Sequence, residues 1–357
     1  PGRAEPGRGF TDALGCAGHE RDLAAEPGPA RMKAAVYERY GPPEVLSLRD
    51  LPTPQPKHGE VLIRVHAASV SSADWRARSL VMPRGFGAIG RLVFGWRRPR
   101  QPILGTELSG VIEAVGPGVE GVRPGDAVVA FPGARMGCHA EFRCLPAESV
   151  VPKPARLSHA QAAALCFGGV TMLDFFRRAG LKAGERVLVN GASGTVGSAA
   201  VQLARHAGAE VAAVCRGENA ELARSLGADA VIDYTAQDPF AGGPRYDLIV
   251  DTVGNAPFSR SAGALRPGGR LLALVSSLPE LLKSPWPGLV GDRRVIAGPA
   301  AERLADVQAI CALAEAGHFT PVIDRVLPLA EVRAAHAHVD GGHKRGSVVL
   351  TMVAGQA

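Results

Sequence analysis

Hydrophobic and polar positions follow two different rhythms along the 357-residue chain. From residue 32 to about 156, short apolar runs are separated by turns rich in proline and glycine, which is typical of β-strands. The clearest runs are 61–65, 110–115, 127–131 and 140–144. This part of the chain therefore predicts a β-barrel or a β-sandwich.

After Pro154 the pattern changes to strands that alternate with helices. Helices are expected at 159–165, 170–179, 219–226 and 256–265, and strands at 187–189, 210–215, 230–233, 246–251 and 269–275. Such alternation indicates a doubly wound parallel sheet with its ligand at the carboxyl ends of the strands. Further helices are expected at 302–316 and 329–339, and a last strand at 346–351 is expected to return to the first domain.

One stretch, residues 186–207, joins a strand, a glycine turn and a helix. Gly191, Gly194 and Gly197 stand in the turn, and glycines let a backbone approach a pyrophosphate closely while the new helix offers its N–H groups. The turn therefore predicts a dinucleotide site. Its candidate cofactor-binding residues are Gly191, Ser193, Gly194, Thr195, Val196 and Gly197.

Composition and charge exclude several classes of protein. With 46% hydrophobic and 21% charged residues the balance is that of a globular protein, and no apolar run approaches the roughly 20 residues of an integral membrane segment. The net charge is +6, but residues 80–103 hold five arginines and no acid. Because nucleic-acid partners require basic residues spread over a face, we expect no nucleic-acid partner.

Residues 1–31 and the cysteines bear on localisation. Residues 1–31 are rich in Gly, Pro and Ala and predict a disordered N-terminal extension, with Met32 as the natural start. Four arginines against five acids in this extension argue against an organelle presequence. Six scattered cysteines are typical of free thiols, so we expect a cytoplasmic protein.

Seven motifs in order carry a resemblance to a known family: 40–46, 67–75, 104–110, 115–119, 122–126, the glycine turn and 344–350. From Met32 to Val353 the chain resembles the medium-chain dehydrogenase/reductase superfamily, in its zinc-independent quinone oxidoreductase branch. The resemblance implies an α/β fold with a GroES-like β-barrel domain (32–156 and 297–357) and a Rossmann domain (157–296). It also implies a homodimer.

Zinc distinguishes the branches of this family. Zinc-binding relatives use Cys, His and Cys ligands, and the similar positions here hold Ser71, Thr106 and Phe167. None of these is a zinc ligand, so we expect no metal. Cys138, His139 and Cys144 lack the close spacing of the family's structural zinc lobe, although a metal there is an alternative.

Without zinc, the resemblance implies hydride transfer from a nicotinamide to a quinone or an enone. The catalytic candidates are Asp74 and Ser71, in the segment beside the nicotinamide in relatives, and Tyr40, in a loop that approaches the cleft. These three side chains are poor candidates for a general acid or a general base. A nicotinamide-binding protein with little turnover is therefore an alternative, and an alcohol dehydrogenase is a third.

The choice of dinucleotide depends on the end of the second strand. Arg216 is suited to a 2′-phosphate and favours NADPH, whereas Glu218 leaves NADH and a surface ion pair as alternatives. Resemblance places Thr171 at the nicotinamide, and Tyr234 is suited to stack on adenine. The remaining cofactor candidates lie at strand ends: Val253, Gly254, Val275 and Ser276.

Residues 80–103 mix arginines with aromatic residues where the family places the substrate mouth. Phe86, Phe94 and Trp96 are predicted to wall an apolar substrate pocket. A packed surface loop and contact with an anionic membrane surface are the alternatives.

Overall fold

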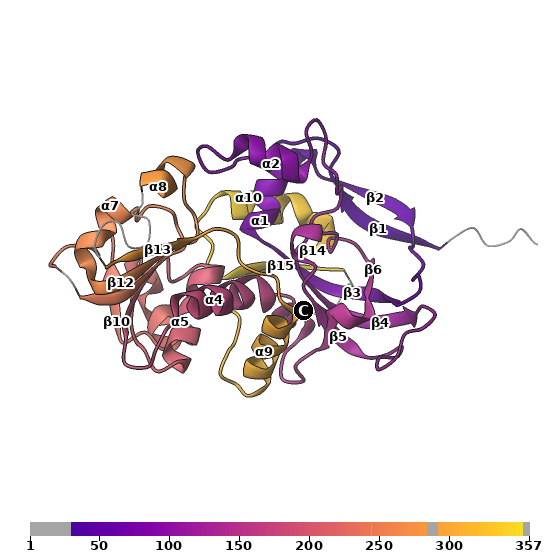
Figure 1. Ribbon diagram of the computed structural model, residues 1–357. Helices are drawn as coiled ribbons and strands as arrows, with labels where there is room; N and C mark the ends of the chain where they lie inside the picture. The colour runs from indigo at the N-terminus through magenta and orange to yellow at the C-terminus, as the bar shows by residue number, and fades with distance from the viewer. Residues whose placement is uncertain (1–29, 244, 284–291, 353–357) are drawn as a thin grey trace, which may run out of the picture. The chain divides into compact units, whose positions relative to one another are not determined.

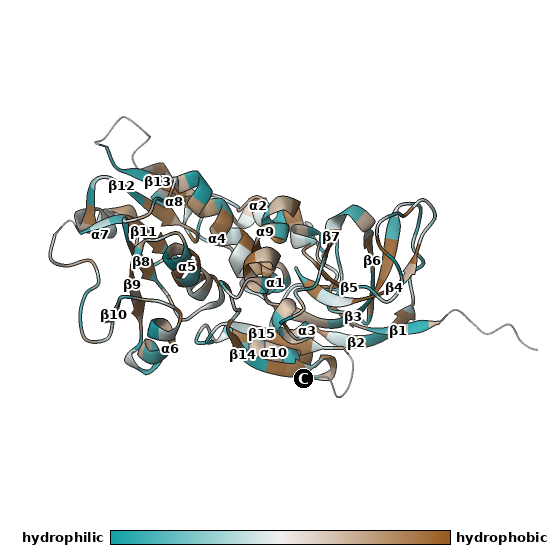
Figure 2. Cartoon of the chain, turned by 90° about the horizontal axis from the view of Figure 1, so that it is seen from below, coloured by the Kyte–Doolittle hydropathy of each residue, from teal (hydrophilic) through white to brown (hydrophobic). Residues whose placement is uncertain are grey.

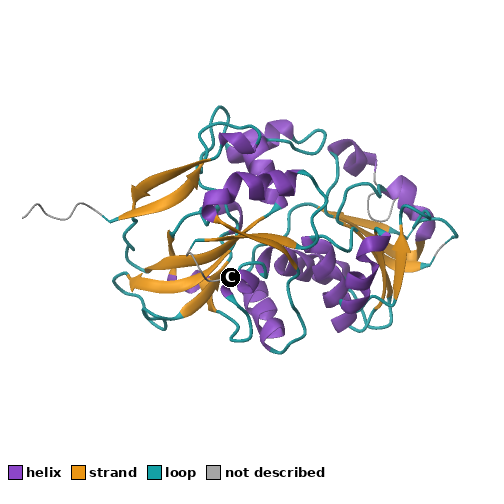
Figure 3. Ribbon diagram, turned by 180° about the vertical axis from the view of Figure 1, so that it is seen from behind, coloured by secondary structure: helices purple, strands orange, loops and turns teal. Residues whose placement is uncertain are grey.

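The computed structural model describes residues 30–243, 245–283 and 292–352. The predicted extension 1–31 therefore lies almost wholly outside the described residues. Residues 31–352 belong to one compact unit that contains two large sheets. Figure 3 shows the strands of these sheets as two separate groups.

One group is a six-stranded parallel sheet. Its order is β10 (Ala230–Asp233), β9 (Glu210–Cys215), β8 (Arg186–Asn190), β11 (Tyr246–Asp251), β12 (Leu265–Ala273) and β13 (Arg294–Ala297). The chain winds outward from β8 in one direction and then from β11 in the other, which is the doubly wound arrangement predicted. The central strands β8, β9 and β11 are strongly apolar (Figure 2) because helices cover both faces of such a sheet.

Helices α4 (Cys166–Ala179) and α5 (Thr195–His206) lie side by side on this sheet (Figure 1). Their close approach depends on Gly168, where a Cβ atom would lie 2.7 Å from the Thr195 carbonyl oxygen. This contact holds the first turn of α5 against α4. Among the described residues after 156, the other α-helices are α3 (His159–Ala162), α6 (Ala220–Ser225), α7 (Phe258–Ser261), α8 (Leu278–Lys283), α9 (Leu304–Glu315) and α10 (Val332–Asp340).

The other group is a seven-stranded sheet. Its order is β14 (Ile323–Pro328), β15 (Ser347–Thr351), β3 (Glu60–Val70), β4 (Leu108–Val115), β5 (Ala127–Ala130) and β7 (Val150–Pro152), with β6 (Phe142–Pro146) paired to β3. The pairing of β15 with β3 confirms that the last strand returns to the first part of the chain. Strands β1 (Arg31–Val36) and β2 (Ser47–Pro52) form a separate antiparallel pair.

Two predictions about the elements are wrong. The region 32–156 is not purely β, because helices α1 (Ser72–Ser79) and α2 (Gly87–Phe94) interrupt it. The predicted helix 256–265 is the short α7 followed by a 3-10 turn, and Leu265 already begins β12. Apolar residues at 262, 264 and 265 imitate a helical spacing, but Leu265 is buried against the sheet.

Candidate functional site

A cavity of about 840 Å³ lies at the carboxyl ends of the parallel strands. Strand ends supply Asn190, Cys215 and Thr252 to its lining. Trp75 of α1 and Phe167 of α4 also line it. The cavity therefore joins the edge of the parallel sheet, where doubly wound folds bind ligands, to residues that precede this sheet in the chain.

The glycine turn between β8 and α5 forms one wall of this cavity. Gly191 has a φ of 84°, and a Cβ on Gly197 would lie 2.0 Å from the Gly191 carbonyl oxygen. These two glycines are therefore required by the turn itself. Gly194 differs, because a Cβ there would meet nothing closer than 3.6 Å. Its missing side chain leaves space beside the first turn of α5, whose amide groups have no partner within the helix.

The segment after α10 packs along the glycine turn. The Gly346 amide donates to the Ser193 carbonyl oxygen at 2.8 Å, and the Thr195 hydroxyl donates to the Gly346 carbonyl oxygen at 2.8 Å. Lys344 Nζ donates to Thr195 Oγ1 and, at 2.6 Å, to the Gly346 carbonyl oxygen. Burial lowers the pKa of Lys344 to about 8. A cation thus stands beside a turn suited to anions, although no role of Lys344 was predicted from the sequence.

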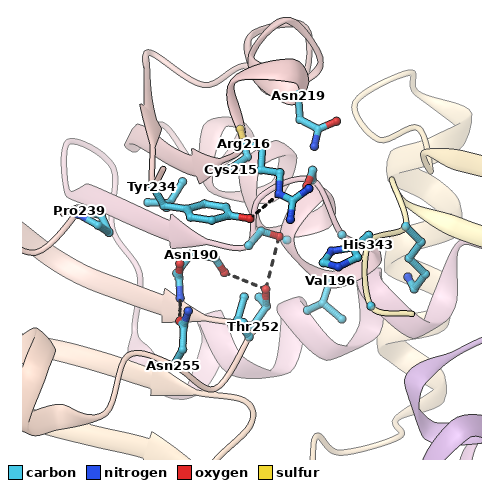
Figure 4. Close-up of a pocket in the computed structure, with 18 of the residues that line it drawn as sticks. Asn190, Val196, Cys215, Arg216, Asn219, Tyr234, Pro239, Thr252, Asn255 and His343 are labelled. Atoms are coloured by element: carbon cyan, nitrogen blue, oxygen red, sulfur yellow. Dashed lines mark hydrogen bonds between the residues drawn. The ribbon is translucent and has the colours of Figure 1, made fainter. Parts of the chain in front are cut away.

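Arg216 and Tyr234 lie at the ends of β9 and β10 (Figure 4). Arg216 Nε donates to the Tyr234 hydroxyl oxygen at 2.8 Å, which raises the pKa of Arg216. Glu218 and Asn219 also line the cavity. The Asn219 side-chain oxygen is buried and has no hydrogen-bond partner. An unpaired buried acceptor costs stability. Because protein atoms enclose this oxygen, a ligand in the cavity does not reach it.

A buried network fixes the loop after β11. The Asp251 carboxylate accepts from Asn190 Nδ2 at 2.9 Å and from the Val253 amide at 3.1 Å. Asn190 Nδ2 also donates to Asn255 Oδ1 at 2.7 Å, and the Thr252 hydroxyl donates to the Asn190 carbonyl oxygen at 2.8 Å (Figure 4). This network was not predicted from the sequence. Its signal was a polar residue that ends each of two apolar strands.

The structure brings nine of the predicted cofactor residues to the cavity: Gly191, Ser193, Gly194, Thr195, Val196, Gly197, Arg216, Tyr234 and Val253. Thr171 is not in the lining; its hydroxyl donates to the carbonyl oxygen of Phe167 at 2.6 Å, and Phe167 itself faces the cavity. Gly254, Val275 and Ser276 border a separate, much smaller pocket.

The predicted catalytic residues lie outside the lining of the cavity. Asp74 is fully buried and begins α1, with Oδ2 accepting from the Ser71 amide and hydroxyl at 2.8 and 2.6 Å. Asp74 Oδ1 accepts from the Gly105 amide at 2.7 Å. Ser71 and Asp74 thus form a capping box that presents Ser72 and Trp75 to the cavity.

Tyr40 and the three predicted pocket aromatics also lie outside this lining. The Tyr40 hydroxyl donates to the Gly95 carbonyl oxygen at 2.8 Å, and burial raises its pKa. Phe94 packs against the apolar cluster around Tyr37 and Leu104. Phe86 is half-buried, whereas 65% of Trp96 is exposed. The predicted aromatic wall is therefore not part of this cavity.

The residues present do not fit a catalytic zinc. Ser71 Oγ is engaged with Asp74, Thr106 Oγ1 is buried without a hydrogen-bond partner, and Phe167 has no ligand atom. Tetrahedral zinc sites require thiolate, imidazole or carboxylate groups. Within the described residues no group of three or more such side chains is placed to hold a metal ion. Burial raises the pKa of the Cys138 and Cys166 thiols.

Glu107, next to Thr106, is buried and is held by hydrogen bonds. Its carboxylate accepts from the Ser69 hydroxyl at 2.5 Å and from the Cys166 and Phe167 amides at 2.7 and 2.9 Å. Those amides belong to the first turn of α4, where an acidic group is favourable. Burial dominates and raises the pKa of Glu107 to about 7. Its acceptor atoms therefore serve to orient α4, and with it Phe167.

Two family models match parts of the chain. Residues 57–155 match the family "Alcohol dehydrogenase GroES-like domain", and residues 226–350 match "Zinc-binding dehydrogenase". Along the described chain, no helix has both the length and the apolar character needed to span a bilayer.

Full-length relatives extend the likeness over most of the chain. The chain is 32% identical to the mitochondrial NAD(P)H oxidoreductase RTN4IP1 of Mus musculus, over 90% of this chain and 89% of that protein. It is 31% identical to the chloroplast envelope quinone oxidoreductase homolog of Arabidopsis thaliana, over 89% and 98%. The quinone oxidoreductase structure from Coxiella burnetii has 28% identity and a TM-score of 0.78, over 91% and 100%. With its GroES-like and parallel-sheet parts and its glycine turn, the chain belongs to the medium-chain dehydrogenase/reductase superfamily, among NAD(P)H-dependent oxidoreductases.

Proposed function

We propose that this protein is a zinc-independent oxidoreductase that uses NADPH in preference to NADH to reduce quinones or α,β-unsaturated carbonyls. The proposal depends chiefly on one observation: the 840 Å³ cavity combines a glycine turn with the Arg216–Tyr234 pair at the next strand ends. We further propose that residues 157–296 are the dinucleotide domain and that the protein is a cytoplasmic homodimer.

The cavity lining supplies a partner for each charged part of a dinucleotide. The α5 amide groups beside Gly194, together with Lys344 Nζ, would hold the pyrophosphate. Arg216 would pair with a 2′-phosphate, and Tyr234, which is 49% exposed, offers a ring face to the adenine.

The part of the cavity lined by Phe167 and Trp75 is suited to an electron-poor substrate. Phe167 and Trp75 give it apolar walls, and Ser72 and Trp75, both residues of its lining, carry a hydroxyl and an indole N–H that are able to donate. When bound, a reduced nicotinamide supplies the hydride. Donors fixed near a carbonyl oxygen stabilise the charge that develops there, so we assign this task to Ser72 and Trp75.

Turnover separates this proposal from a binding protein. NADPH oxidation is measured with 9,10-phenanthrenequinone, with a short enone, and with a primary alcohol plus NADP⁺ as the comparison. We expect quinone- or enone-dependent oxidation that a metal chelator leaves unchanged. Tight NADPH binding without turnover of either acceptor would favour a nicotinamide-binding protein with little activity. Chelator-sensitive alcohol oxidation would favour an alcohol dehydrogenase.

Cofactor preference is tested by Arg216→Ala. A charged hydrogen bond contributes roughly 1.5–3 kcal/mol, so kcat/KM for NADPH is expected to fall by about 10- to 100-fold while the value for NADH changes little. Arg205→Ala is the matched control, because Arg205 pairs with Asp229 and lies outside the cavity lining. An equal effect of Arg216→Ala on both cofactors would remove the phosphate contact from the proposal.

A further inference from the structure

Helix α2 and its flanks expose an unusual number of apolar side chains. Of the twelve exposed large hydrophobic residues among those described, five lie between residues 81 and 96. We call these five the α2 face: Val81, Ile89, Leu92, Val93 and Trp96. Leu92 and Trp96 are 66% and 65% exposed. Clustered exposed apolar groups mark interaction surfaces, whereas isolated ones are ordinary.

Helix α2 has an exposed side and a side that packs against the protein, and the sequence makes both apolar. Ile89, Leu92 and Val93 are spaced i, i+3 and i+4, so they share one side of the helix. The other side faces the protein: Gly90 is buried against Met82, and Phe94 packs into the core cluster with Tyr37. A helix that is apolar on both sides and covered on only one requires a second apolar environment. In Figure 1, α2 lies at the upper edge of the molecule.

The position of the α2 face is fixed by contacts that do not use it. Arg91 Nη1 donates to the Trp96 carbonyl oxygen at 2.9 Å, and the Tyr40 hydroxyl holds the Gly95 carbonyl oxygen. At the start of the segment, the Leu278 amide of α8 donates to the Arg84 carbonyl oxygen at 2.9 Å. The apolar side chains therefore project from an anchored backbone.

Charge indicates what covers this face. Five arginines lie within or next to the same segment of the chain, and all are exposed: Arg84, Arg91, Arg97, Arg98 and Arg100. Residues 80–103 contain no acid. A wholly apolar partner surface would not require this excess of positive charge. A second copy of the same face would bring like charges together, because a twofold interface places the same patch on both sides.

We propose that the α2 face docks on an anionic lipid surface. The five apolar side chains enter the boundary between headgroups and acyl chains, and the arginines meet lipid phosphates. The helix lies in the plane of the interface, because its eight residues are far too few to cross a bilayer. This inference concerns a surface outside the cavity and does not depend on the proposed reaction.

Vesicle flotation of the full chain tests the proposal. Vesicles of phosphatidylcholine alone are compared with vesicles containing about 30% phosphatidylglycerol, in 0.1 M and 0.5 M salt. We expect binding to the anionic vesicles only, weakened at high salt. Each basic residue near such a surface contributes roughly a fivefold change in partitioning, so Arg97→Gln with Arg98→Gln should weaken binding by about 25-fold. Arg123→Gln with Arg205→Gln, two exposed arginines elsewhere, is the control.

The apolar contribution is tested separately by Leu92→Asn with Val93→Asn. We expect at least about a tenfold loss of binding, with Leu304→Asn and Val326→Asn as controls on exposed leucine and valine. Sedimentation in parallel reports the oligomeric state. Failure to bind anionic vesicles, equal loss in the control variants, or conversion of a dimer to monomers by the Leu92/Val93 variant without loss of vesicle binding would each overturn the proposal. The last result would assign the face to contact between copies.

Discussion

The glycine turn and the start of α1 were both predicted to be parts of the site, but they differ in how their residues lie relative to the cavity. Residues of the turn line the cavity themselves, whereas Ser71 and Asp74 lie behind it and only Ser72 and Trp75 face it. In the turn, the backbone creates the site, and glycine is what the backbone requires. At α1, the acidic side chain is used to begin a helix. A motif thus indicates the location of a site more securely than the task of each side chain.

The largest expected effect comes from Gly197→Ala. Its Cβ would lie 2.0 Å from the Gly191 carbonyl oxygen, which is backbone and cannot rotate away. We expect a loss of stability of more than about 2 kcal/mol and no measurable NADPH binding. Thermal denaturation and titration of NADPH fluorescence measure both quantities.

Gly194→Ala is the matched comparison. Gly194 has a φ of −80°, which alanine adopts freely, and a Cβ there meets nothing closer than 3.6 Å. The thermal midpoint should therefore stay close to the parent value while NADPH affinity falls at least about tenfold, because the methyl group occupies space meant for the ligand. If Gly194→Ala bound NADPH as tightly as the parent chain, the pyrophosphate would not lie against this turn.

A smaller effect, on stability rather than binding, is expected for Asp74→Ala. Removal of the carboxylate leaves the buried Ser71 and Gly105 amides without their acceptor, at a cost of about 2 kcal/mol. Chemical denaturation measures this loss. Ser72→Ala is the contrasting variant, because Ser72 faces the cavity: kcat should fall while stability changes by less than about 1 kcal/mol.

The two variants distinguish a positioning residue from a catalytic one. If Asp74→Ala abolished turnover at a temperature where circular dichroism shows the chain folded, with NADPH affinity retained, Asp74 would have to act on the substrate. If instead kcat recovered on cooling in parallel with folding, the capping role would account for the loss.

The parallel sheet could be predicted because each strand is a short apolar run bounded by turns, and periodicity alone identifies such elements. The start of α1 was also visible, since Ser71-x-x-Asp74 is a capping box, but the surrounding β pattern outweighed it. Helix α2 was harder still to predict from the sequence. Gly87 and Gly90 lower its helical propensity, and the contacts that hold it join residues far apart in the chain, such as the packing of Phe94 into the core and the Tyr40–Gly95 hydrogen bond.

The candidate site divides in the same way. Residues fixed by the local backbone, such as Gly191 and Arg216, could be placed from the sequence. Residues that depend on distant partners could not: Asn190 joins Asp251 across 61 positions, and Lys344 reaches Thr195 across 149. Single-sequence patterns carry no record of such pairings. Thr171 illustrates the limit, because the predicted helix is present but the side chain that faces the cavity is Phe167, one turn earlier.

Lys344 gives the smallest expected effect and links the turn to the distant part of the chain. Burial lowers its pKa to about 8, below its unfolded value of about 10.4, so the unfolded chain binds more protons between these two pH values. The stability of the free protein should therefore rise with pH across this window.

The affinity for NADPH should instead fall as pH rises across the same window. Below pH 8 the ammonium group is already present to meet the pyrophosphate, whereas above it the proton must be taken up on binding, so Kd should rise by up to about tenfold between pH 8 and 9. Lys344→Met should weaken binding by roughly tenfold at pH 7 and flatten this pH dependence, and Lys344→Arg should restore affinity without the step near pH 8. A pH profile that Lys344→Met leaves unchanged would mean that the cation beside the turn serves only to hold the Gly346 segment, and the anion would then be bound by backbone amides alone.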